Sequence, residues 1–541
     1  MALRRYLPRG SLSRPWATSL FPKSYRDRQR LPFLQTRRQL LTLAIESSCD
    51  DTCVAILEKS ASGSAVLHFN EKVSLDIRPY GGVYPQAAVV LHTSELGPLL
   101  RKALRALPDV SKTDNDNAKV VWVDGRPRVK PDFVTVTRGP GMSSNLATGL
   151  NTAKGLSVAW DVPLVGVNHM QAHALTPRLV HALELGRTEV NTEKAHENDE
   201  QDIEATIEMI PAKPFPDFPF LSLLVSGGHS MLVHSNSLIA HSILASTPNV
   251  AIGDMLDKCA RSILPPSILS AENKAYGPLL EDFAFPGTSG AALDEIGHNY
   301  EYQPPPRRPP KVFDSGFGWT LNVPLGETVK TMNVYEFAGL NGQVQKVLSE
   351  RPQMGLDERR VLARETMRIA FEHLASRVLY ALRTGLIEEK AMKNLSARKD
   401  GERVTETGTE VAEQKQDAGA VNVEVEATPA QPIKTVVLSG GVASNNFLRH
   451  IMRSMLDNAG FKDVKLIAPP VSLCTDNAAM IAWTGMEMYE QGWHTDLNVL
   501  VMRPWPVDPD TSGGGILGAP GWRRREGFAD APSSLSSSGE E

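Results

Sequence analysis

The sequence repeats one strand–turn–strand pattern in two distant places, and this repeat constrains the fold more than any other feature. Residues 41–57 run from an apolar stretch through the polar turn Glu46-Ser47-Ser48 into a second apolar stretch. Residues 220–233 do the same through the turn Ser226-Gly227-Gly228-His229. Each copy predicts two paired strands, so the pattern indicates an internal duplication.

Elsewhere, short apolar runs alternate with longer helical stretches, which is typical of a layered α/β protein. The clearest unit is a strand at 133–136, a glycine loop at 138–141, a helix, and a returning strand at 164–167. This order predicts a β-α-β crossover. No apolar run approaches the roughly 20 residues of a membrane-spanning helix, so these runs predict core strands and core helices.

The first 39 residues differ in composition from the rest of the chain. They hold ten arginine or lysine residues and one acid, Asp27, among several serines, which is typical of a mitochondrial transit peptide. A basic arm that binds nucleic acid is the alternative. Without these residues, 47 basic and 61 acidic residues leave a net charge of −14. An RNA-binding enzyme with this charge needs a local basic patch.

Several segments are too polar or too rich in proline, glycine and serine to build a core. They divide the chain into two predicted lobes, at 40–175 and 218–490, and the first lobe could be completed by a helix near 478–500. The predicted intervening and flanking segments are a disordered insertion at 186–212, insertions at 284–312 and 391–432, and a flexible tail at 506–541. The four cysteines show no disulfide pattern.

Two histidines, His169 and His173, stand one helical turn apart directly after the strand 164–167. This spacing lets both imidazoles bind one metal ion, although such pairs also occur on ordinary exposed helix faces. A zinc peptidase would need a glutamate after the first histidine, where Met170 stands. Asp476 lies at a strand-to-helix turn and is a candidate third ligand or, alternatively, a helix N-cap.

Three glycine turns each follow an apolar strand: Gly139-Pro140-Gly141, the turn at 226–229, and Ser439-Gly440-Gly441. Glycine lets backbone N–H groups approach an anion closely, so three such turns predict a nucleotide site. Any one of them could instead be a tight structural turn.

Several long motifs in order resemble the tRNA N(6)-adenosine threonylcarbamoyltransferase family, once described as O-sialoglycoprotein endopeptidases. The resemblance covers about residues 40–490 and rests on Ile45-Glu46-Ser47-Ser48-Cys49-Asp50-Asp51-Thr52, Gly81-Gly82-Val83-Tyr84-Pro85, Gly139-Pro140-Gly141-Met142, Gly166-Val167-Asn168-His169-Met170-Gln171-Ala172-His173, Val225-Ser226-Gly227-Gly228-His229, Asp257-Lys258, Ser439-Gly440-Gly441-Val442-Ala443-Ser444-Asn445 and Cys474-Thr475-Asp476-Asn477-Ala478-Ala479-Met480.

The resemblance implies a duplicated actin-like fold, of the ASKHA type, with two ribonuclease-H-like lobes and an active site between them. It implies one divalent metal ion per subunit, zinc or iron, held by His169, His173 and Asp476. Asp51 then matches the acidic position that the family uses near the reaction centre, where bacterial members usually have glutamate, and it is the candidate catalytic residue. It would remove or relay a proton, or alternatively make a structural hydrogen bond. The implied substrate contacts are Ser226, Gly227, Gly228, His229, Asp257, Gly277 and Asn445.

The same resemblance implies transfer of a threonylcarbamoyl group from L-threonylcarbamoyl-adenylate to N(6) of the adenosine at tRNA position 37, with release of AMP. The adenylate would come from a separate synthase, and the chain would be a homodimer of the mitochondrial matrix. The alternative function is a nucleotide-binding actin-like module without transferase activity.

Overall fold

The computed structural model describes residue 39 onward, except 77–79, 81–83, 113–118, 197–212, 272–274, 288–299, 301, 307–310, 325–330, 385–431, 526–527 and 529–541. The predicted leader at 1–39 and the predicted insertion at 391–432 therefore lie almost wholly outside the described residues.

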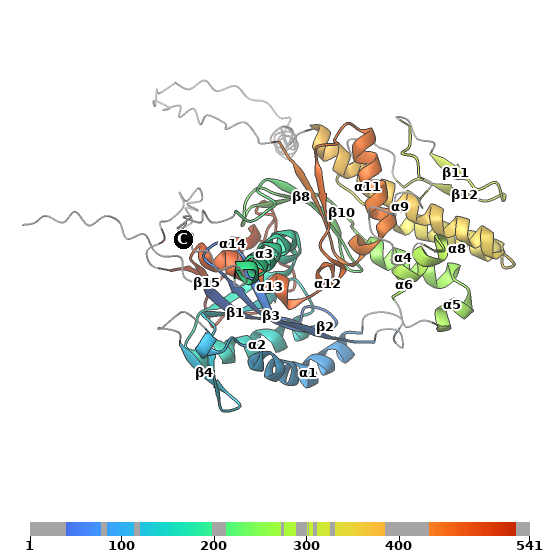
Figure 1. Cartoon of the computed structure of the whole chain (residues 1–541). Helices are drawn as coiled ribbons and strands as arrows, with labels where there is room; N and C mark the ends of the chain where they lie inside the picture. Colours follow the sequence, from blue (N-terminus) through green and yellow to red (C-terminus); the bar gives the residue numbers. More distant parts are fainter. Residues whose placement is uncertain are drawn as a thin grey trace, which may run out of the picture. The chain divides into compact units, whose positions relative to one another are not determined.

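The first sheet has seven strands in the order β16-β15-β7-β6-β1-β2-β3 (Figure 1). On one side of β1, the pairs β1–β2 and β2–β3 are antiparallel. On the other side, the pairs β1–β6 and β6–β7 are parallel. The bounds are β1 Leu40–Glu46, β2 Asp51–Lys59, β3 Ala65–Ser74, β6 Phe133–Gly139, β7 Leu164–Asn168, β15 Trp493–Thr495 and β16 Trp522–Arg524.

The second sheet repeats this topology with the order β10-β9-β8-β13-β14. Here β8 pairs antiparallel with β9 and parallel with β13, as β1 pairs with β2 and β6. The bounds are β8 Phe220–Val225, β9 Ser230–Ser235, β10 His241–Ser246, β13 Thr435–Ser439 and β14 Lys465–Ile467. Five strands of the first sheet, in the order β7-β6-β1-β2-β3, match β14-β13-β8-β9-β10 of the second in order and direction, which confirms the predicted duplicated α/β fold.

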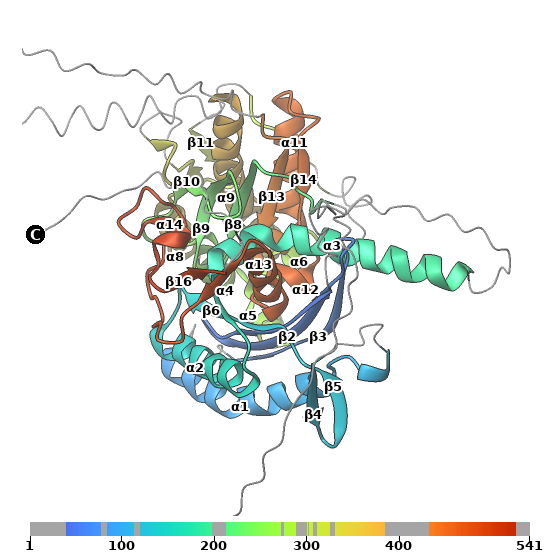
Figure 2. The same ribbon diagram turned by 90° about the vertical axis from the view of Figure 1, so that its left-hand side faces the viewer.

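Helices cover the faces of both sheets. In the first repeat, α1 (Pro85–Arg105) and α2 (Ser143–Trp160) pack on one face, and α2 makes the predicted crossover from β6 to β7. On the other face lie α3 (His169–His196) and α13 (Ala478–Glu490), which contact each other (Figure 2). The second sheet packs against α4 Ile252–Ile263, α6 Tyr276–Ala284, α8 Ala338–Glu350, α9 Leu356–Thr384 and α11 Asn446–Asn458 through a shared apolar core.

The layer of α3 and α13 lies between the two sheets. Trp483 of α13 and Leu175 of α3 belong to one buried cluster that also holds Ala55 of the first sheet and Leu224 of the second. Helix α13 therefore packs on the first sheet although it comes more than 300 residues later in the chain. This arrangement brings the start of α3 and the start of α13 together.

Two polar segments are more ordered than the sequence predicts. The flexible tail predicted from residue 506 is wrong for residues up to 525, because α14 (Gly515–Gly518) and β16 form there. The glycine-rich composition predicts flexibility, but Trp505 just before this segment is buried and holds it in place. Its indole N–H donates to the Gly515 carbonyl. Likewise, α3 continues to His196, into the predicted insertion at 186–212.

Among the described helices, none combines the length and the apolar character that crossing a membrane requires. All four cysteines are free thiols.

Candidate metal centre and nucleotide site

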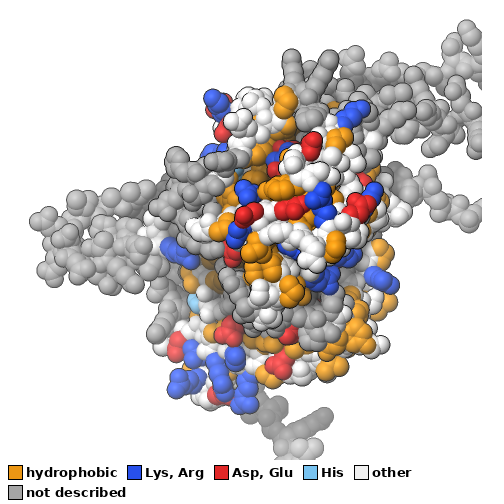
Figure 3. Space-filling model, turned by 90° about the vertical axis from the view of Figure 1, so that its right-hand side faces the viewer, with side chains coloured by type: hydrophobic (Ala, Val, Ile, Leu, Met, Phe, Trp, Pro, Cys, Tyr) orange, Lys and Arg blue, Asp and Glu red, His pale blue; other side chains and the backbone are white. Residues whose placement is uncertain are grey.

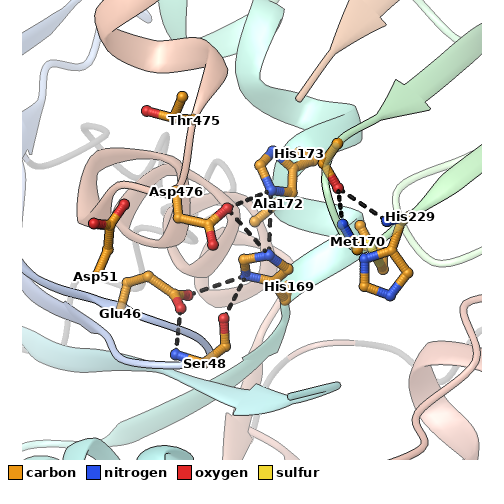
Figure 4. Close-up of polar contacts among 12 residues, drawn as sticks. Glu46, Ser48, Asp51, His169, Met170, Ala172, His173, His229, Thr475 and Asp476 are labelled. Carbon is orange, nitrogen blue, oxygen red and sulfur yellow. Dashed lines mark hydrogen bonds and ion pairs between the residues drawn. The ribbon is translucent and has the colours of Figure 1, made fainter. Parts of the chain in front are cut away.

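The side chains of His169, His173 and Asp476 converge on one point (Figure 4). The two Nε2 atoms lie 3.2 Å apart, and Asp476 Oδ1 lies 3.0 Å from Nε2 of His173 and 3.4 Å from Nε2 of His169. Both histidines are almost fully buried, so the cluster is no ordinary exposed pair. The structure thus brings together the three residues that the sequence predicts as metal ligands.

Local capping fixes both ends of this cluster. Asn168 Oδ1 accepts the backbone N–H groups of Met170 and Gln171, which starts α3 with His169 in its first turn. Asn477 Oδ1 accepts the N–H of Met480 and caps α13. Because Asn477 is the cap, the neighbouring Asp476 is free to face the histidines, and the alternative N-cap role for Asp476 is wrong.

The donor geometry fits a small divalent ion. Metal–ligand bonds of about 2.0–2.2 Å place neighbouring ligand atoms about 3.3–3.6 Å apart in a tetrahedron. The three observed separations, 3.0, 3.2 and 3.4 Å, need to widen only slightly to reach this range. Two imidazoles and one carboxylate are ligands that zinc and ferrous iron share, and they leave coordination positions open.

A second carboxylate, that of Glu46, contacts His169 on the side away from Asp476, and it was not predicted from the sequence as a site residue. Glu46 is buried at the end of β1, and its Oε2 lies 3.2 Å from Nδ1 of His169, the nitrogen that faces away from Asp476. The backbone N–H of Ser48 and the hydroxyl of Thr137 both donate to Glu46. A carboxylate that accepts the Nδ1 proton leaves the Nε2 lone pair directed at the metal position.

The electrostatics also favour a bound cation. Burial alone would raise the pKa of Asp476, but His169 and His173 hold it well below its usual value. For His169, Asp476 and Glu46 outweigh burial and raise the pKa well above its usual value. Two carboxylates on opposite nitrogens of one imidazole thus create a buried site that attracts positive charge, which a divalent ion would supply.

Glu46→Gln is expected to weaken metal binding by about 10–100-fold without unfolding the protein, because the amide keeps the shape but loses the charge that polarises His169. Chelator competition, with the bound metal measured by mass spectrometry, checks this. The matched control is Glu58→Gln, which changes another glutamate–histidine pair, with His68, at 2.7 Å and away from the cluster. Equal metal affinity in both variants would contradict the role of Glu46.

Asp51 starts β2 beside the metal cluster and is tied to it through a lysine. Lys72 Nζ donates to Asp51 Oδ2 at 2.7 Å, to Thr475 Oγ1 at 3.2 Å and to the Asp476 carbonyl at 3.4 Å. Burial raises the pKa of Asp51, although the Lys72 ammonium opposes this rise. Lys72 was also not selected from the sequence. It lies in β3, whose residues are mostly half-buried or exposed, and a lysine on such a strand looks like an ordinary surface residue.

The turn at residues 226–229 joins β8 to β9 and faces the cluster. Ser226 Oγ accepts the N–H groups of Gly228 and His229. A Cβ on Gly227 or Gly228 would meet no described atom within 4 Å, so the chain's own packing does not require glycine there. Burial, and after it the charges of His169 and His173, lowers the pKa of His229 to about 4. This imidazole is therefore neutral near pH 7.

Asp257 of α4 and Gly277 of α6 lie together, since the Gly277 N–H donates to the Asp257 carboxylate. Burial raises the pKa of Asp257 to about 6, although Arg261 opposes the rise. The same helix is held against the turn at 226–229 by Gly253, whose N–H donates to the Ser226 carbonyl at 3.1 Å. Asp257 and Gly277 are thus on elements adjoining that turn.

The raised pKa of Asp257 predicts a pH-dependent stability. The folded state prefers the neutral carboxyl, so its stabilising contribution is present below pH 3.8 and is lost as the pH rises through about 6. Asp257→Asn is expected to increase the free energy of unfolding at pH 7.5 by about 2 kcal/mol and to change it little at pH 4. Thermal unfolding at both pH values checks this.

Asp254→Asn is the control, because Asp254 lies one turn earlier in α4 and pairs with Lys258 at the surface. An equal increase in the free energy of unfolding at pH 7.5 in both variants would contradict the prediction that the effect comes from the raised pKa of Asp257.

Asn445 has a structural role in the third glycine turn. Its Oδ1 accepts the Leu448 N–H at 2.9 Å and caps α11, and its side chain is largely buried. Gly440 has φ 94°, and a Cβ there would lie 2.4 Å from the Val225 carbonyl oxygen. This turn therefore packs against the end of β8, and a substrate contact by Asn445 remains a prediction.

The chain resembles named proteins over most of its length. The family model of TsaD, described as tRNA N6-adenosine threonylcarbamoyltransferase, matches residues 126–187 and 201–483. These ranges include His169, His173 and Asp476, whereas Asp51 precedes them.

Individual relatives match almost from end to end. The chain is 29% identical to the mitochondrial tRNA N6-adenosine threonylcarbamoyltransferase of Schizosaccharomyces pombe over 90% of this chain and 89% of that protein. It is 27% identical to the Zymomonas mobilis protein of that name (87% and 92% covered) and to a probable mitochondrial one of Arabidopsis thaliana (84% and 70%). The duplicated fold, the metal cluster and the family match lead to one conclusion: the chain belongs to the tRNA N6-adenosine threonylcarbamoyltransferase family.

Proposed function

We propose that this enzyme transfers the threonylcarbamoyl group of L-threonylcarbamoyl-adenylate to N(6) of the adenosine at tRNA position 37 and releases AMP. The observation that carries the proposal is the convergence of His169, His173 and Asp476 beside Asp51, within a chain of this family. The mixed anhydride of the donor already contains a good leaving group, so the reaction is limited by the weak nucleophilicity of the adenine amine.

Asp51 removes or relays the proton of that amine as it attacks the carbamoyl carbon. Burial raises the pKa of Asp51 and brings it nearer the working pH, which improves a general base. Lys72 keeps the carboxylate in place and links it to the backbone at Asp476. The proton acceptor and the metal cluster are therefore held in a fixed relation.

The turn at 226–229 and Asp257 bind the adenylate. The open surface above Gly227 and Gly228 lets a ligand approach the backbone closely. His229 is neutral, so its imidazole can donate one hydrogen bond to the adenylate and accept another without adding charge. Gly277 and Asn445 complete the proposed contacts.

His169, His173 and Asp476 would hold one zinc or iron ion, with Glu46 orienting His169. When bound, this ion supplies positive charge that orients and polarises donor oxygens. The chain does the rest of the proposed reaction: it positions the amine and accepts its proton.

The enzyme is proposed to act as a homodimer in the mitochondrial matrix, with its adenylate made by a separate synthase. The basic composition of residues 1–39 and the names of two relatives support the location. The proposed halves of the cleft are the lobe at 40–175, completed by the helix near 478–500, and the lobe that begins at 218 and ends before that helix.

The test is nucleoside mass spectrometry of unmodified tRNA after incubation with residues 40–541, a threonylcarbamoyl-adenylate synthase, threonine, bicarbonate and ATP. Threonylcarbamoyladenosine is expected only when this chain is present. A protein that binds metal and adenylate but forms no product would instead support the nucleotide-binding module without transferase activity. The buried histidine pair argues against that alternative, because magnesium-dependent nucleotide sites use oxygen ligands.

A further inference from the structure

A small hairpin follows α1 and stands apart from both main sheets. Its strands, β4 (Val120–Val123) and β5 (Arg126–Val129), form their own two-stranded sheet. The turn residues Asp124 and Gly125 have φ 47° and 77°, as a two-residue hairpin turn requires. Val121, Val123 and Val129 pack against the core beneath. The hairpin is therefore an anchored element with one inner and one outer face.

The outer face presents aromatic and apolar side chains to solvent. Trp122 is 70% exposed and Val120 is 43% exposed, because successive side chains of a strand alternate between faces. Trp122 has the largest side chain among the exposed hydrophobic residues of the described chain. Tryptophan is enriched at interfaces, where an exposed indole offers a large flat surface for stacking.

The surroundings of Trp122 are basic in an otherwise acidic protein. Residues 101–130 contain eight lysine or arginine residues and four aspartates, a net charge of +4, whereas residues 40–541 as a whole carry −14. The exposed cations are Arg101, Lys102, Arg105, Lys119 and Arg126. Figure 3 shows Lys and Arg side chains gathered at its lower left, in the lower part of the molecule, which also holds α1 and the hairpin.

Two of these cations, Arg101 and Arg105, are positioned by the hairpin turn, whereas Lys102 pairs with Glu71 of β3 at 3.4 Å. Asp124 lies 2.6 Å from Arg105 and 3.4 Å from Arg101, so one carboxylate links the last turn of α1 to the hairpin. Both arginines are still more than half exposed, with five N–H donors each. The helix end and the hairpin therefore form one surface, which we call the hairpin surface (Arg101, Lys102, Arg105, Lys119, Trp122 and Arg126).

We propose that the hairpin surface docks the body of the tRNA while its adenosine occupies the metal site. This inference rests on the proposed function and adds the surface that recognises the RNA. Cations that pair with phosphates, next to an aromatic ring on which a base can stack, are the combination that RNA-binding surfaces use. Residues 40–541 carry a net charge of −14, which repels the phosphates of RNA, so this basic patch supplies the local charge complementarity.

The hairpin surface lies at a distance from the reaction. Near the start of α1, His92 contacts the Thr52 hydroxyl and the Cys49 carbonyl, on either side of Asp51. The hairpin follows the other end of this helix, at Arg105, which is 13 residues after His92, or about 20 Å at 1.5 Å per residue. The RNA contacted here is thus remote from the modified adenosine, and the contact sets the register of the tRNA rather than the chemistry.

The experiment measures binding of unmodified full-length tRNA to the full metal-loaded chain by fluorescence anisotropy over a range of salt concentrations, together with steady-state transfer. Trp122→Ala is expected to raise Kd and KM about tenfold, the loss of one stacked base, with kcat unchanged. Lys119→Glu combined with Arg126→Glu is expected to reduce the slope of log K against log salt by about 2.

Controls make the same chemical changes on exposed positions of the other repeat: Leu356→Ala for the apolar truncation and Lys346→Glu for the charge reversal. They are expected to leave tRNA binding unchanged. Unaltered Kd, KM and salt slope in the hairpin variants would overturn the proposal, as would equal losses in the controls. Failure of the proposed function is distinct: the unmutated chain would then bind tRNA without forming threonylcarbamoyladenosine.

Discussion

His173→Ala is expected to remove the bound metal and to lower the transfer rate by about 100-fold or more, with the fold intact. The side chain would contribute one of the three proposed ligand atoms, and its Nε2 lies 3.0 Å from Asp476 and 3.2 Å from His169. Without it, the two remaining ligands cannot hold the ion against water, and the charge stabilisation it supplies is lost. Metal analysis of the purified protein and nucleoside mass spectrometry measure both effects.

The control is His181→Ala, which changes a histidine on the same helix, about two turns away, that packs near Phe215. It is expected to keep its metal and its transfer rate. Full metal occupancy in His173→Ala would show that the ion, if any, binds elsewhere.

Asp51→Asn is expected to lower the transfer rate by about 100-fold or more, while metal content and tRNA affinity stay at wild-type values. The amide is nearly isosteric but cannot accept the amine proton. Because burial raises the pKa of Asp51, the wild-type rate should fall as the pH drops through that raised pKa and this group becomes protonated. The variant should lack this acidic limb of the pH–rate profile.

Asp51→Glu keeps a carboxylate and should retain much of the rate, which separates proton transfer from a purely structural hydrogen bond to Lys72. Asp496→Asn, at an exposed aspartate paired with Arg523, is the surface control. Wild-type turnover in Asp51→Asn would exclude Asp51 as the base.

The sequence predicted the features that depend on local pattern. Alternating apolar runs marked the two strand–turn–strand copies, and the observed strand orders of the two sheets repeat each other. The helical spacing of His169 and His173 required only a helix start, which Asn168 provides. The local pattern left Asp476 as either a metal ligand or a helix N-cap, and only the motif resemblance indicated the ligand role.

Features that depend on distant packing were not predictable in this way. Glu46 and His169 are 123 residues apart, and only the pairing of β1 with β6 and of β6 with β7 brings them together. The order of residues 506–525 depends on where Trp505 is buried, which composition does not reveal. The capping role of Asn445 was not predicted either, because the motif resemblance indicates only a substrate contact, which remains a prediction.

The position of α13 between the two sheets has a consequence for how the protein is made. During synthesis or import, strands β1, β2 and β6 emerge long before residues 478–490, whose buried Trp483 and Met486 cover one face of those strands. Until residues 476–490 arrive, the first repeat exposes an apolar sheet and lacks Asp476. A nascent or C-terminally truncated chain should therefore depend on chaperones and be unable to acquire its metal.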